Sequence, residues 1–518
     1  MKISIQWTVA VALSLAWPLR AQETPAQEEI PIVGETIDVR VVNVETVITK
    51  ASGERVRGLT AADFRLLVDG REVPVEYFAE VEEGTSVSTA ETRPAAPAAP
   101  VSAGEEVGRS YLVYVDDSFS LSNRRNAVLE KLESDLTLLH PADRMAVLAF
   151  NGTRLSVLCG WTGDAKTLKE ALAQARQRPA LGGEMLAHQR ALQADVDWVL
   201  DSADSLGSGD SDRVGGPKVS EIDEILAPMA KRISPEARTQ LGKTTDAAVA
   251  ALRGFETPPS RKVMLLLSGA WSLSVAAKLY GPLVEAANQL GYTVYPVDAS
   301  QSDATEVTAL DTLARATGGR ALVSANNDAF RQVVADSGSY YWLGFTPAWK
   351  ANDRQHQVTV EVRRADLKVR SRNGFSDLSR RTETALKAES VLLLGGATDD
   401  RRLLVEIGPS KKHGGNFDVP VTLGVPVEAL ALTPRGKGFM AEVPLAVATE
   451  DKAGNRATLS SSSLKVAIAT LPKAGTYARF QTVVRLSSLE QRLVFTVPDP
   501  ISGRILWNEG LADSGKAK

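Results

Sequence analysis

The chain has only one cysteine, Cys159, in 518 residues. A single cysteine excludes an internal disulfide, a zinc site built on paired cysteines and a CxxC redox pair. It also lies far from the N-terminus, where a lipid-anchoring cysteine would be expected. The fold must therefore be stabilised by packing.

Long apolar runs are lacking except near the N-terminus. The run from Ile3 to Leu19 follows Lys2 and ends just before Ala21, which is the pattern of a secretory signal peptide. Pro18 shortens this run below a comfortable membrane span, so the pattern favours cleavage over an uncleaved anchor. We expect residues 1–21 to be removed and the mature chain to be secreted or periplasmic, without a transmembrane segment.

A basic run that could neutralise a track of phosphates is also missing. Lys and Arg total 59 against 63 Asp and Glu, so the net charge is -4 and nucleic acid is not an expected partner. The chain is 44% hydrophobic and 24% charged, which is the usual globular mixture. Its length predicts three or four compact units.

Complete catalytic motifs are not found. The four histidines lack HExxH or paired spacing, which argues against a zinc hydrolase. Ser268 lies in LSGAW rather than in a GxSxG turn, and Cys159 follows an apolar strand, as core cysteines do. We therefore assign no catalytic residue and expect that the protein is not an enzyme.

The two ends of the chain have strand patterns. Alternating residues and tight-turn signals predict a small β domain over 31–83, and 339–376 either complete this domain or stand apart from it. Residues 84–108 are rich in Pro, Ala, Ser and Thr without periodicity, which predicts a flexible linker. Regularly spaced strand segments predict a C-terminal antiparallel β-sandwich over 386–518.

Strands and helices alternate over 109–338. Continuous apolar runs such as SYLVYV are typical of strands buried on both faces of a parallel sheet. This rhythm predicts an α/β, doubly wound (Rossmann-like) unit, in which ligands bind at the carboxyl ends of the strands. Residues 185–255 interrupt the rhythm with a long helical pattern, which predicts an inserted helical hairpin or arm.

A DxSxS motif formed by Asp116, Ser118 and Ser120 directly follows the first strand of this unit. On a loop between strand and helix, the three side chains can converge on one hard cation such as Mg²⁺ or Mn²⁺. Alternatively, Asp117 or Ser120 caps the next helix by accepting from its free backbone N–H groups. The motif fits either role.

Five segments, in this order, resemble a von Willebrand factor type A (VWA) domain: SYLVYVDDSFS, RMAVLAFN, LGGE, RKVMLLLSG and YTVYPVDAS. The flanking segments VRGLTAADFRLLVDG, YYWLGFTPAW and VTVEVRRADLKVRSRNGF resemble the secreted "VWFA-related" proteins of acidobacteria. Together these segments cover roughly residues 35–376. The resemblance implies the VWA fold, but the family has no general assigned chemistry.

The DxSxS motif resembles the opening of the metal-ion-dependent adhesion site of VWA domains. The expected threonine after Gly182-Gly183 is replaced by Glu184, and the aspartate expected on the fourth strand is replaced by Ser268. Asp116 and Glu184 would still provide two carboxylates. The resemblance therefore implies either a rearranged site of Asp116, Ser118, Ser120 and Glu184, or a site that Glu184 closes as an internal ligand.

These observations predict a secreted or periplasmic protein of the adhesion type, which binds a protein or peptide partner with or without a divalent cation. The alternative is a metal-free structural subunit of an envelope assembly. Such a subunit would contact its partners through the helical insertion 185–255 and the β domains.

Overall fold

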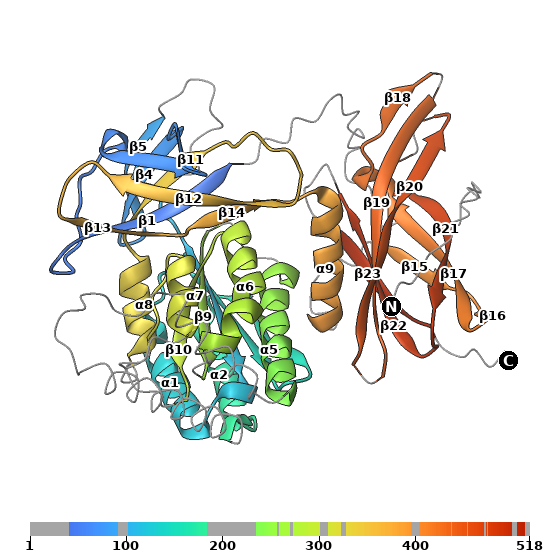
Figure 1. Cartoon of the computed structure of the whole chain (residues 1–518), viewed down its shortest axis with the longest axis horizontal. Helices are drawn as coiled ribbons and strands as arrows, with labels where there is room; N and C mark the ends of the chain where they lie inside the picture. Colours follow the sequence, from blue (N-terminus) through green and yellow to red (C-terminus); the bar gives the residue numbers. More distant parts are fainter. Residues whose placement is uncertain are drawn as a thin grey trace, which may run out of the picture.

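The computed structural model describes residues 41–91, 102–183, 235–255, 258, 260–269, 273–300, 309–322, 328–394, 403–436, 438–452, 454–470, 473, 475–499 and 505–512. They form an N-terminal β-sandwich, an α/β unit with a mainly parallel sheet, and a C-terminal β-sandwich (Figure 1). The predicted signal peptide, residues 1–21, lies outside this part of the chain. No helix within it is long and apolar enough to cross a membrane.

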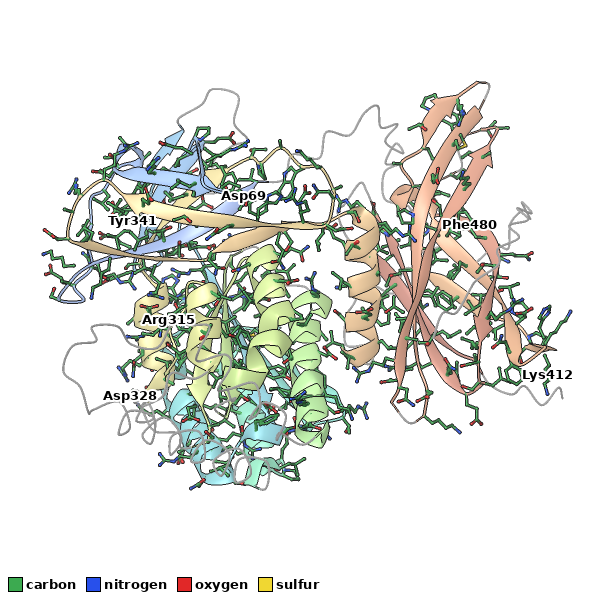
Figure 2. The ribbon with its side chains drawn as sticks, viewed as in Figure 1. Asp69, Arg315, Asp328, Tyr341, Lys412 and Phe480 are labelled. Atoms are coloured by element: carbon green, nitrogen blue, oxygen red, sulfur yellow. The ribbon has the colours of Figure 1, made fainter. Side chains whose placement is uncertain are left out.

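The N-terminal sandwich combines two distant parts of the chain in two antiparallel sheets. One sheet has the order β13-β1-β11-β4-β5 and the other β14-β12-β2-β3. Apolar residues such as Phe64 and Tyr341 fill the space between them, and Tyr341 is labelled in Figure 2. The elements are β1 (Val42–Lys50), the 3-10 turn η1 (Ala61–Asp63), β2 (Phe64–Val68), β3 (Arg71–Val73), β4 (Tyr77–Glu82), β5 (Thr85–Glu91), β11 (Tyr340–Phe345), β12 (Arg354–Val362), β13 (Leu367–Ser371) and β14 (Gly374–Asp377).

The sequence predicts a flexible linker over residues 84–108. In the structure, however, the backbone at both ends of this segment is hydrogen-bonded. Strand β5 pairs antiparallel with β4, and the backbone after residue 102 returns to the same edge. Ser86 N donates to Glu105 O at 2.9 Å, and Val107 N donates to Gly84 O at 2.6 Å. Backbone hydrogen bonds hold these polar residues in place. Composition does not reveal such bonds, so it predicts a linker here. Residues 92–101 lie outside the described ranges.

Gly344 in β11 leaves space for the ring of Tyr77. A methyl group at position 344 would lie 1.8 Å from Tyr77 Cζ, and the tyrosine, which is 2% exposed, has no free space to enter. Gly344→Ala is therefore expected to lower the free energy of unfolding by about 1–3 kcal/mol, measured by urea denaturation. Gly160→Ala on β8 (Leu155–Thr162) is the matched control, because a methyl group there meets nothing within 4 Å. Equal losses in both variants would contradict the prediction.

The α/β unit is built on the sheet β10-β9-β6-β7-β8. Strands β10, β9, β6 and β7 are parallel, and β8 pairs antiparallel with β7 at the edge. Apolar residues pack helices on both faces of this sheet. The strands are β6 (Arg109–Asp116), β7 (Arg144–Phe150), β8, β9 (Arg261–Ser268) and β10 (Tyr292–Asp298). One face carries α1 (Ser122–Ser134), the 3-10 turn η3 (Asp135–Leu138), α2 (Ala165–Gln177) and α8 (Ala329–Ser337), and the other carries α5 (Pro235–Gly254), α6 (Leu273–Leu290) and α7 (Ala309–Ala316).

Helix α5 corrects part of the predicted helical insertion, 185–255. Its residues Leu241, Ala248 and Leu252 are buried in the core on one face of the sheet. The alanines along this face allow the helix to approach the sheet closely, so the segment belongs to the α/β unit and is not an arm. The rest of the predicted insertion, 185–234, lies outside the described residues.

The C-terminal sandwich packs two antiparallel sheets around an apolar core that includes Phe480 (Figure 2). One sheet holds β15 (Leu404–Ile407), β16 (Lys411–His413), β17 (Asn416–Pro426) and β21 (Tyr477–Leu486). The other holds β18 (Thr433–Arg435), β19 (Gly438–Glu450), β20 (Arg456–Ile468), β22 (Gln491–Pro498) and β23 (Ile505–Ala512). A 3-10 turn, η4 (Val427–Ala429), follows β17.

Helix α9 (Arg380–Leu394) stands between the α/β unit and this sandwich (Figure 1). Its residues Ala388 and Val391 pack against Trp507 on the outer face of one sheet. On its other side, Lys387 Nζ donates to the carbonyl oxygens of Arg253 and Gly254, both at 3.1 Å, and so caps α5. The predicted boundary at residue 386 therefore falls inside a helix.

The N-terminal sandwich covers the amino ends of the parallel strands. The guanidinium carbon, Cζ, of Arg261, the first residue of β9, lies 3.9 Å from the ring centre of Tyr340 in β11. Arg55 and Arg370 of the sandwich pair with Asp336 on α8. This docking leaves the opposite edge of the parallel sheet, where the DxSxS motif lies, free of the N-terminal sandwich.

Candidate functional site

The residues of the DxSxS motif lie together at the carboxyl end of β6. Asp116 is the last residue of the strand and caps the 3-10 turn η2 (Asp117–Phe119) by accepting from Ser118 N at 3.0 Å. Ser120 Oγ donates to the carbonyl oxygen of Asp116 at 2.5 Å. All three motif residues are buried. The turn therefore folds the motif back on Asp116.

Ser268 lies against the same carboxylate. It ends β9, which neighbours β6, and its hydroxyl donates to Asp116 Oδ2 at 2.7 Å. Ser268, which stands where the resemblance implies an aspartate, is therefore a direct partner of Asp116.

The Gly182-Gly183 segment contacts the motif through its backbone. Leu181 N donates to Asp117 O at 2.7 Å, and Gly182 N donates to Ser120 O at 3.2 Å. A side chain at 182 would meet Ser120 O at 2.6 Å, so only glycine fits here. Glu184, the predicted fourth ligand, lies outside the described residues.

Gln240 is a site residue that sequence reasoning missed. From α5, its Nε2 donates to Ser118 Oγ at 3.1 Å and to Gly152 O at 3.4 Å. A Cβ at position 152 would lie 2.8 Å from this nitrogen, so the glycine leaves room for the amide. No sequence motif connects a glutamine on a distant helix with the DxSxS loop.

Asp117 joins a buried ion-pair network rather than capping α1. Its carboxylate pairs with Arg125 Nη1 at 2.6 Å and with Arg178 Nε at 2.7 Å. The N-cap of α1 is Leu121, and no side chain caps it, so neither Asp117 nor Ser120 has the alternative capping role. Burial raises the pKa of Asp117, and the two guanidinium groups oppose that shift.

Burial also controls the charge of Asp116. Desolvation raises the pKa of this carboxyl to about 7, although the hydroxyl of Ser268 and the N–H of Ser118 lower it. The neighbouring Asp117 adds a smaller upward shift. Near neutral pH the group therefore changes readily between its neutral and ionised forms.

The oxygens around Asp116 suit a hard cation in type but supply little charge. They comprise one carboxylate and the hydroxyls of Ser118, Ser120 and Ser268, which are ligands that Mg²⁺ accepts. Among the described residues, no group of three or more His, Cys, Asp or Glu side chains could hold a metal. The second carboxylate that the resemblance implies is Glu184, which lies outside the described residues.

Comparisons with known proteins add little. No family model matches the chain, and no curated protein matches it. The X-ray structure of Northeast Structural Genomics Consortium target SoR45 is 10% identical over 23% of this chain and 93% of that chain, with a TM-score of 0.16. The crystal structure of MtrC from Shewanella baltica OS185 is 16% identical over 22% of this chain and 23% of that chain, with a TM-score of 0.13. Likenesses at these scores carry no argument about fold or function.

Proposed function

We propose that the chain is a secreted or periplasmic protein of the VWA type, which binds a protein or peptide partner at the carboxyl edge of its parallel sheet. The strand order supports a doubly wound VWA fold, because the chain leaves β6 toward β8 on one side and toward β10 on the other. Ligands of such sheets bind where the winding direction changes, which here is between β6 and β9. The pair of Asp116 and Ser268 at this point is the observation that carries the proposal.

We also propose that a divalent cation, Mg²⁺ or Mn²⁺, binds at this site. Asp116, Ser118 and Ser120 would hold it, and Glu184 would add the second negative charge or fill the place of a carboxylate of the partner. Leu181 lies beside these residues and is 53% exposed, so it offers an apolar anchor for a partner. The proposal assigns no catalytic residue.

Thermal unfolding of the mature protein tests the cation. After chelation, Mg²⁺ or Mn²⁺ is expected to raise the unfolding midpoint, because a ligand at about 100 times its Kd stabilises a fold by about 2.7 kcal/mol. Asp116→Asn and Glu184→Ala should abolish this shift. Asp298→Asn removes a carboxylate from the end of β10, two strands away, and should leave the shift intact. No shift with any ion, or equal shifts in all variants, would refute cation binding.

The alternative function, a metal-free structural subunit, also has an observation in its favour. Protein donors already occupy the oxygens that a cation would need, since Ser268 and Ser118 N donate to Asp116 while Gln240 donates to Ser118. Because α5 is part of the core, the contacts of such a subunit would fall on 185–234 and the β-sandwiches. This reading predicts partner binding that chelation and Asp116→Asn both leave unchanged.

A further inference from the structure

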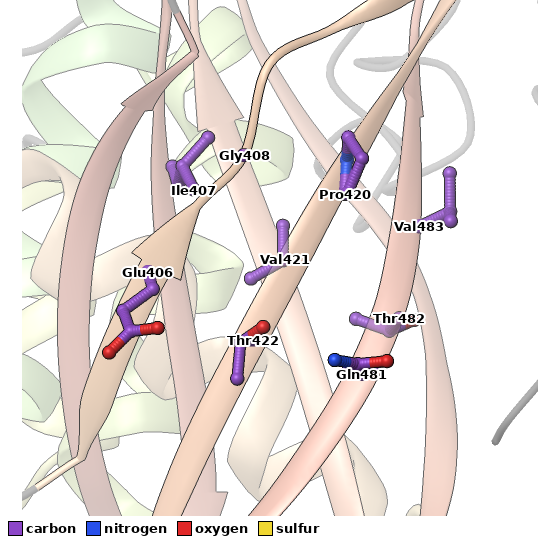
Figure 3. Close-up of a pocket in the computed structure, with 9 residues that line it drawn as sticks. All are labelled: Glu406, Ile407, Gly408, Pro420, Val421, Thr422, Gln481, Thr482 and Val483. Atoms are coloured by element: carbon purple, nitrogen blue, oxygen red, sulfur yellow. The ribbon is translucent and has the colours of Figure 1, made fainter. Parts of the chain in front are cut away.

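A groove of about 440 Å³ crosses the outer face of the C-terminal sheet formed by β15, β17 and β21 (Figure 3). Its volume lies in the range of small-ligand sites, about 300–1,000 Å³. The groove runs across the strands, because its lining comes from three adjacent residues on each of them. It belongs to a different unit from the Asp116 site, so ligand binding here does not depend on the proposed function.

One wall of the groove is polar and the other is not. Glu406, Thr422 and Gln481 stand side by side in the register of the three strands and form the polar wall. Two residues along each strand, on the same face, Gly408, Pro420 and Val483 form the apolar wall. A ligand in the groove would therefore meet hydrogen-bonding groups on one side and carbon atoms on the other.

The polar wall is not used by the protein itself. In the described ranges, the side chains of Glu406, Thr422 and Gln481 make no hydrogen bond or ion pair. On the same face, by contrast, Asp418 pairs with Arg485 through contacts of 2.6 and 3.0 Å. No cation among the described residues compensates the carboxylate of Glu406, so its charge is complementary to a positively charged ligand group.

The floor of the groove argues against a peptide that binds by adding a strand to β17. Strand β17 is paired on both sides, with β15 and with β21, so its backbone cannot accept another strand across the groove. Recognition must rely on side chains that offer a carboxylate, a hydroxyl and an amide within one row. A sugar ring matches this wall with its hydroxyl groups and the apolar wall with its C–H faces.

We propose that this groove binds an amino-sugar saccharide, with the ammonium group at Glu406, the ring hydroxyls at Thr422 and Gln481, and the C–H face of the ring on Pro420 and Val483.

Calorimetric titration of the mature full-length protein tests this site with a β-1,4-linked glucosamine tetramer. The titration is run at about pH 6, where amino groups of this kind are charged. Glu406→Gln is expected to weaken binding by about tenfold or more, since a charge-assisted hydrogen bond is lost. Thr422→Trp should abolish binding by filling the groove. Glu442→Gln changes an exposed carboxylate of the other sheet and is the matched control.

A glucose tetramer with the same linkage separates the role of the amine from that of the hydroxyls, and it should bind more weakly. The unfolding midpoint of each variant shows whether it is folded. If Thr422→Trp does not fold, the test of the site rests on Glu406→Gln. The proposal fails if the glucosamine tetramer does not bind, if the glucose tetramer binds equally well, or if Glu406→Gln binds as tightly as Glu442→Gln.

Discussion

Replacing Arg125 by methionine is expected to lower the free energy of unfolding by roughly 3–5 kcal/mol. Arg125 and Asp117 are both 0% exposed, and their charged groups lie 2.6 Å apart. Without the guanidinium, the cationic partner of the buried carboxylate among the described residues is Arg178, whose side chain is 19% exposed. Methionine fills most of the volume, so the loss reports the charge and not a cavity.

Arg125 also satisfies backbone groups at the end of α2. Its Nη2 donates to the carbonyl oxygens of Arg178 at 2.7 Å and Arg176 at 3.4 Å. In the variant the part-buried Arg178 carbonyl loses this donor, which adds to the cost, whereas the Arg176 carbonyl still accepts from Asn126 Nδ2 at 3.3 Å. A double variant, Arg125→Met with Asp117→Leu, should lose less than the sum of the two single changes, because it leaves no unpaired charge behind.

Arg65→Met on β2 is the matched control. Arg65 pairs with Glu72 at 2.8 Å and Glu361 at 3.1 Å, but its side chain is 42% exposed. Exposed ion pairs contribute about 0–1 kcal/mol, so the control should change stability little. Urea denaturation followed by circular dichroism measures both variants. Similar losses for Arg125→Met and Arg65→Met would show that the buried network has no special weight.

The parallel strands were predictable from the sequence because burial on both faces leaves a continuous apolar run. SYLVYV is an example, and every residue of β6 is buried in the structure. Strand β5 and helix α9 were not predictable in the same way. Strand β5 is an edge strand of mainly small and polar residues, which lack a continuous apolar run. Helix α9 precedes a long series of strands, and its apolar C-terminal residues resemble the start of that series.

The sequence predicts some contacts of the candidate site but not others. Asp116, Ser118 and Ser120 are close in the chain, so their proximity follows from one turn after one strand. The contacts of Ser268 and Gln240 depend on which elements become neighbours in the folded chain. No local pattern contains that information, so the sequence identifies Ser268 only as a missing ligand and does not indicate Gln240.

In the presence of a chelator, Asp116→Asn is expected to increase the free energy of unfolding at about pH 8 and to change it little at about pH 4. Burial raises the pKa of Asp116 from 3.8 to about 7. Between these values the folded chain keeps the proton and the unfolded chain loses it. The stability of the wild type therefore falls as the pH rises through this window and levels off above it, by up to about 4 kcal/mol.

The asparagine variant lacks this dependence because its side chain is neutral in both states. Its amide oxygen can still accept from Ser118 N, and the hydroxyl of Ser268 can rotate to accept from its amide nitrogen. Urea denaturation at several pH values should therefore give two curves that separate between about pH 4 and pH 7. Asp298→Asn, the control at the end of β10, should follow the wild type.

Two curves that stay parallel would mean that the pKa of Asp116 is not raised, and a variant that becomes less stable than the wild type as the pH rises would mean that the fold stabilises the ionised carboxylate. Adding Mg²⁺ or Mn²⁺ without chelator extends the comparison. A cation favours the ionised form, so it should stabilise the wild type at about pH 8 and leave the asparagine variant unchanged. If the proposed cation binds, it therefore offsets part of the cost of burying the Asp116 charge and narrows the difference in stability between the two proteins.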